Sequence, residues 1–138
     1  MKLYRAVSLT LTIIFAVTGL FFLFIPDKVL ILFNNLSPTF HLSVSPVIGA
    51  NFYLILAAAY MYLVTVLAFR MFRHPENRVY PALLVHAKLA SSVLSLALFL
   101  VHAHYLIYLA NFVVDGFIGI LVIILSRKAK AGVKWAYH

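Results

Sequence analysis

Four long apolar runs decide most of what this chain can fold into. They cover residues 3–25, 47–69, 79–101 and 105–125. Each is long enough to cross a hydrocarbon core of about 30 Å as an α-helix, which takes about 20 residues. The sequence therefore predicts an all-α membrane protein, in which a four-transmembrane-helix bundle makes up a single domain over residues 1–138.

Composition supports this class and removes several others. Of the 138 residues, 65% are hydrophobic and 10% charged, and the mean hydropathy of +1.07 lies far above that of soluble domains. The net charge of +8 does not indicate nucleic acid as a partner, because the basic residues cluster at the ends of apolar runs. The chain has no cysteine, which excludes disulfides, thiolate metal sites, iron–sulfur clusters and covalently attached haem.

The basic residues also predict the orientation in the membrane. With four crossings, nine of the eleven lysines and arginines fall on one side, and cytoplasmic segments carry this excess. They are Lys2, Arg5, Arg70, Arg73, Arg78, Arg127, Lys128, Lys130 and Lys134. We therefore expect a multi-pass protein of the cell (inner) membrane with both termini, a loop at 70–78 and a basic tail at 126–138 in the cytoplasm.

Two connections then lie outside. In the outer loop 26–46, Asp27 can cap a short interfacial helix that follows the first span. The apolar face predicted for that helix consists of Val29, Leu30, Leu32, Phe33 and Leu36. The second connection, around residues 102–104, is so short that the third and fourth spans must be antiparallel neighbours.

Two full charges, Lys88 and Asp115, lie deep within the third and fourth spans. At 1.5 Å per residue, both are roughly 13–15 Å from the cytoplasmic end, so the two charges can meet. An ionisable side chain at this depth costs roughly 2.5–3.5 kcal/mol, which makes a functional site the default hypothesis and a structural ion pair the alternative.

Other polar residues follow the same helix faces. Those able to support the pair or to bond across the bundle are Asn51, Tyr60, Tyr62, Ser91, Ser92, Ser95 and Asn111. Gly116 and Gly119 favour close approach of the helices.

The histidines support two further hypotheses about bound groups. Outside the membrane, His41, His102 and His104 are candidate ligands for zinc or copper. Within the third span, His86 has no second histidine at its depth, so a haem there would need an unusual second ligand. No cofactor is predicted, although haem, quinone or a metal ion stays an alternative.

The stretch from Gly19 to Pro26 and Asp27, at the end of the first span, together with the four-span layout, resembles the small four-helix DoxX-like inner-membrane proteins. The resemblance implies a compact four-helix inner-membrane protein, some relatives being subunits of quinone-linked oxidoreductases. It transfers no catalytic residue to this chain.

Three hypotheses about function follow. The first is a non-catalytic accessory subunit of a larger membrane complex, for example a respiratory or other redox assembly, because the chain is small and has no catalytic constellation. The second is a small oligomeric transporter or channel that uses Lys88 and Asp115. The third is a haem, quinone or metal module that uses the histidines. Besides the lipid bilayer, the expected partners are other membrane subunits or further copies of the chain.

Overall fold

The computed structural model describes residues 1–46 and 51–134, and within these ranges the chain is helical without a β-strand. The elements are α1 (Lys2–Phe24), α2 (Pro26–Leu36), the short 3-10 helix η1 (Ser37–Phe40), α3 (Asn51–Arg73), α4 (Val79–Val101) and α5 (Leu106–Lys134). Four of them, α1, α3, α4 and α5, are long and apolar enough to cross a membrane. The prediction of a multi-pass helical membrane protein is confirmed at this level.

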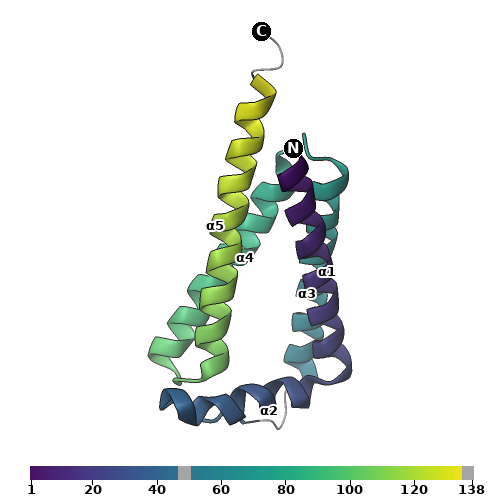
Figure 1. Cartoon of the computed structure of the whole chain (residues 1–138). Helices are drawn as coiled ribbons and strands as arrows, with labels where there is room; N and C mark the ends of the chain where they lie inside the picture. Colours follow the sequence, from purple (N-terminus) through teal and green to yellow (C-terminus); the bar gives the residue numbers. More distant parts are fainter. Residues whose placement is uncertain (47–50, 135–138) are drawn as a thin grey trace.

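The four long helices form two antiparallel hairpins. Helix α1 packs along α3, and α4 packs along α5, while α3 and α4 make the main contact between the hairpins. The start of α1, the end of α5 and the connection at 74–78 lie at one end of the molecule, which we call the terminal end (Figure 1). Helix α2 crosses the opposite end from α1 towards α5, and we call this the α2 end (Figure 1).

The predicted bounds of the spans differ from the observed helices mainly at the terminal end. Helix α4 matches the prediction, but α3 continues to Arg73, and α5 continues to Lys134 through most of the predicted basic tail. Alanine and lysine in the stretch after Arg127 are strong helix formers, which explains why the helix continues past its apolar part. Residues 47–50 of the predicted second span and 135–138 of the tail lie outside the described residues.

A proline separates α1 from α2. Because a residue before proline is disfavoured in the helical region, Ile25 leaves it with φ −138° and ψ 47°, and α1 ends. Pro26 then stands in the first turn of α2, where its missing N–H costs no hydrogen bond. The prediction that Asp27 caps α2 is wrong: the N-cap is Ile25, and Asp27 lies in the first turn, where its charge favours the helix N-terminus.

Helix α2 turns only part of its predicted apolar face towards the bundle. Val29, Leu30 and Phe33 are half-buried, whereas Leu32 and Leu36 are exposed. At 100° per residue, these five side chains spread over about 160° of the helix surface, which is more than one packed face can cover.

The segment after η1 is held against the α4–α5 connection. The Asn34 side chain donates to the Ser45 carbonyl (2.8 Å) and accepts from the Ser45 N–H (2.9 Å). The Ser43 N–H in turn donates to the His104 carbonyl at 3.2 Å. The Asn34 bonds fix the segment to α2, and the Ser43 bond connects the two loops at the α2 end, between residues far apart in sequence.

Candidate functional site

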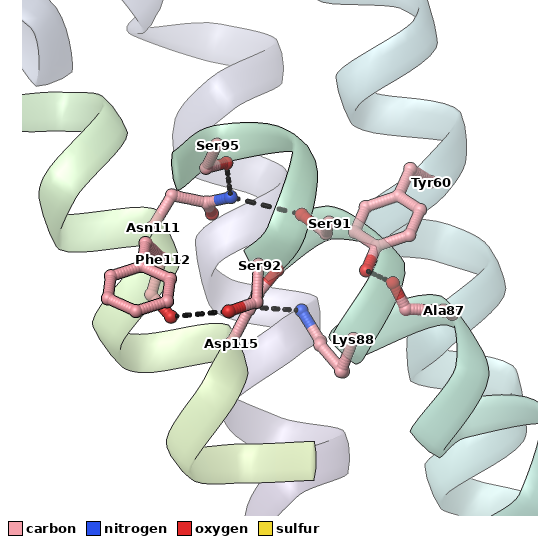
Figure 2. A network of polar contacts seen from close by, with 9 residues as sticks. All are labelled: Tyr60, Ala87, Lys88, Ser91, Ser92, Ser95, Asn111, Phe112 and Asp115. Atoms are coloured by element: carbon pink, nitrogen blue, oxygen red, sulfur yellow. Dashed lines mark hydrogen bonds and ion pairs between the residues drawn. The ribbon is translucent and has the colours of Figure 1, made fainter. Parts of the chain in front are cut away.

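Lys88 of α4 and Asp115 of α5 form an ion pair within the bundle. Lys88 Nζ lies 2.8 Å from Asp115 Oδ1 (Figure 2). The two residues are only 2% and 3% exposed. The predicted pairing is therefore confirmed, and both charges are withdrawn from the surface.

Small residues on α5 bring the two helices close enough for this contact. A Cβ atom on Gly119 would lie 2.9 Å from Leu89 Cδ2, and one on Gly116 would lie 3.0 Å from Ser92 Oγ. Ser92 uses this proximity to donate to the Phe112 carbonyl at 2.8 Å. The predicted role of these glycines in close helix approach is confirmed by these distances.

Two aromatic rings from the other hairpin surround the lysine. Lys88 Nζ lies 4.5 Å from the centre of the Phe15 ring of α1 and 5.1 Å from that of Tyr60 of α3. Ring faces attract a cation, and the attraction grows when the cation is desolvated. Tyr60 also donates its hydroxyl to the Ala87 carbonyl at 3.1 Å (Figure 2). All four membrane-spanning helices therefore meet at this one charge.

The two tyrosines of α3 that were predicted to support the pair lie on different sides of the helix. Tyr60 faces the pair, but Tyr62 is 73% exposed and belongs to the outer surface, because two residues correspond to about 200° of helix rotation. Its predicted support of the pair is wrong. Phe15 was not predicted at all, because one phenylalanine among the twelve of this chain carries no signal of which ring faces a charge.

The carboxylate is bonded unevenly. Oδ1 accepts from the lysine, whereas Oδ2 is buried and has no hydrogen-bond donor among the described residues. A buried acceptor without a donor is costly, so Oδ2 is an unsatisfied atom in a site that is otherwise closed to the surface.

A second polar cluster lies one helical turn towards the α2 end. Asn111 of α5 donates its side-chain amide to Ser91 Oγ (3.0 Å) and to Ser95 Oγ (2.6 Å) of α4 (Figure 2). The structure thus brings together four of the predicted polar residues, Ser91, Ser92, Ser95 and Asn111, on the facing sides of α4 and α5. Asn51 begins α3, but its side chain lies outside the described residues.

The described histidines form no group of three that could hold a metal ion. In the described ranges, no three residues among histidine, cysteine, aspartate and glutamate are placed to hold a metal ion. His41, His102 and His104 are all exposed, and the His104 ring contacts Phe99 edge-on at 5.0 Å between ring centres. His86 is exposed on the outer side of α4. Binding of zinc, copper, haem or quinone stays a prediction.

The site is a buried polar contact between helices that is closed to the surface. Its charges compensate each other, the Tyr60 and Ser92 hydroxyl groups donate to backbone carbonyls, and aromatic rings cover the lysine. Comparisons with protein-family models, with curated proteins and with solved structures gave no match for this chain.

Proposed function

We propose that this protein is a non-catalytic accessory subunit that packs against larger partners in a membrane complex. The observation that carries the proposal is the closure of the Lys88–Asp115 pair, whose side chains are 3% and 5% exposed. A substrate site needs charges that a substrate can reach, whereas these two are shielded by Phe15, Tyr60 and the close contact of α4 with α5.

The outer surface also supports an accessory role. Large apolar side chains are exposed along all four long helices, for example Ile13 of α1, Leu56 of α3, Val93 of α4 and Phe117 of α5. Such faces fit lipid and the apolar surfaces of other membrane subunits. A respiratory or redox host complex and membership of the DoxX-like group are proposals that depend on the four-span layout and on the stretch from Gly19 to Asp27.

Native mass spectrometry of the protein, extracted from its own membranes in mild detergent, tests this function. We expect to find the masses of partner subunits bound to the chain. The double variant Lys88→Met with Asp115→Leu should bind the same partner subunits, because the ion pair stabilises the fold and does not contact a partner. Recovery of the chain without any other protein, stable and uniform, would contradict the accessory role.

A second candidate is a small oligomeric transporter or channel. Asp115 Oδ2 favours it, because a buried carboxylate oxygen without a donor is available to a proton or to a hydrogen-bond donor that passes through the bundle. Proton or anion flux in proteoliposomes should then fall in Asp115→Asn and remain in Ser91→Ala. Unchanged flux in Asp115→Asn would exclude the pair as a transport site.

We further propose that the terminal end faces the cytoplasm and that α2 lies at the outer surface of a cell membrane. The excess of basic residues at the terminal end supports this orientation. Because the chain has no cysteine, Glu76→Cys and Ser43→Cys each introduce a single thiol at an exposed position. A membrane-impermeant maleimide should label Ser43→Cys in intact cells and Glu76→Cys only after lysis; the reverse pattern would invert the orientation.

A further inference from the structure

His86 is a polar residue on the outward side of α4, away from the interior of the bundle. It lies about 10 Å from the start of α4, within the membrane-spanning segment, and is exposed. Its imidazole makes no hydrogen bond within the described part of the chain. Ionisable residues in membrane spans almost always face protein or a water-filled cavity, because lipid tails offer neither donor nor acceptor. The position of His86 therefore points to a protein surface that covers this face.

The neighbours of His86 form a regular seam along the same face. The outer seam of α4 consists of exposed residues at alternating spacings of three and four: Leu83, His86, Ala90, Val93, Ala97 and Leu100. This is the spacing by which one helix packs along a parallel partner in a left-handed pair. It runs along the side of α4 opposite Lys88, so it is independent of the contact with α5.

Its composition differs from that of the outward face of α5 at the same spacing. On α5, the corresponding exposed residues are Val113, Phe117, Ile120 and Ile124, all bulky and apolar, as suits lipid. In the outer seam, two alanines follow the histidine at alternate positions, and small residues let helix backbones approach closely.

We propose that the outer seam binds the outer seam of a second copy of this chain. Two copies inserted with the same orientation place their α4 helices parallel and bring both His86 residues to the same depth. A neutral imidazole carries one donor and one acceptor, so one ring can donate to the other across a two-fold axis. A two-fold contact of this kind uses the same surface on both subunits, and His86 satisfies that requirement by itself.

Disulfide cross-linking in native membranes tests the contact. Val93 and Leu94 are adjacent and almost equally exposed, at 65% and 64%, but only Val93 belongs to the outer seam. The chain has no cysteine of its own, so each variant carries a single thiol. Under mild oxidation, Val93→Cys should form a cross-linked dimer several-fold faster than Leu94→Cys. Equal rates for the two variants, or no dimer from either, would overturn the proposal.

Variants of His86 test the polar contact. In detergent, His86→Ala should dimerise about three-fold to twenty-fold more weakly, the range for one hydrogen bond between membrane helices, while His86→Gln should keep most of the affinity. Dimerisation unaffected by His86→Ala would refute the imidazole pairing. This result is independent of the proposed accessory role. Co-purified partner subunits test the accessory role, whereas dimerisation of the purified chain tests self-association.

Discussion

Removing one member of the Lys88–Asp115 pair should destabilise the bundle far more than removing both. Breaking a buried ion pair on one side costs about 3–5 kcal/mol, because the remaining charge is left without compensation. Replacing both members by apolar residues of similar volume is often neutral or stabilising by about 1–4 kcal/mol. We therefore expect Lys88→Met and Asp115→Leu each to lower the free energy of unfolding by about 3–5 kcal/mol, and the double variant to recover nearly all of it.

The structure also predicts which single variant is worse. In Asp115→Leu, the orphaned ammonium keeps the faces of Phe15 and Tyr60, each worth at least about 0.5 kcal/mol. In Lys88→Met, the orphaned carboxylate keeps no hydrogen-bond donor among the described residues. Lys88→Met should therefore be the less stable of the two by at least about 1 kcal/mol.

Unfolding in mixed detergent micelles, followed by far-UV circular dichroism at pH 7, measures these differences. Tyr62→Phe is the matched control, because this exposed tyrosine of α3 does not face the pair, and its variant should match the parent chain. A double variant as unstable as the sum of the two single variants would refute the reasoning, as would single variants that cost less than about 1 kcal/mol.

Three further perturbations test the packing around this pair and the loops. Gly119→Ala should lower stability by up to about 2 kcal/mol in the same unfolding assay. The new methyl group would lie 2.9 Å from Leu89 Cδ2 and 3.1 Å from Leu89 Cγ, an overlap that costs about 1–3 kcal/mol, against about 1 kcal/mol that alanine gains over glycine within a helix; a midpoint above that of the parent chain would mean that Leu89 moves freely. Asn111→Ala should cost about 0.6–1.7 kcal/mol, the range for hydrogen bonds between membrane helices, and a loss above 3 kcal/mol would assign the cluster a larger role. Asn34→Ala removes both bonds to Ser45, so limited proteolysis should cut near Ser45 faster than in the parent chain; equal cleavage rates would show that other contacts hold the loop.

Much of the fold follows from the sequence because lipid restricts what an apolar run can do. Helix α4 has the predicted bounds, and the pairing of Lys88 with Asp115 follows from equal depth on two helices that a short connection makes neighbours. These inferences need only the rise per residue and the cost of isolated charges in a membrane.

The remainder depends on which side of each helix faces the interior, and apolar spans carry little of that information. Tyr60 and Tyr62 differ by two positions in an almost uniformly apolar run, yet only Tyr60 faces the lysine. Phe15 had no distinguishing neighbour in the sequence. On α2, five apolar residues suggested a single face, but only three turn towards the bundle, because the limits of that face are set by α1 and α5.

The division into two hairpins also has a consequence for biosynthesis. Helix α4 on its own would carry an unpaired lysine into the bilayer, at a cost of roughly 2.5–3.5 kcal/mol. Its counter-charge comes 27 positions later, beyond a turn of only a few residues. We therefore expect α4 and α5 to leave the insertion machinery together, with their charges already paired. The α1–α3 hairpin, which is synthesised earlier, then supplies the two aromatic rings as the halves of the molecule dock.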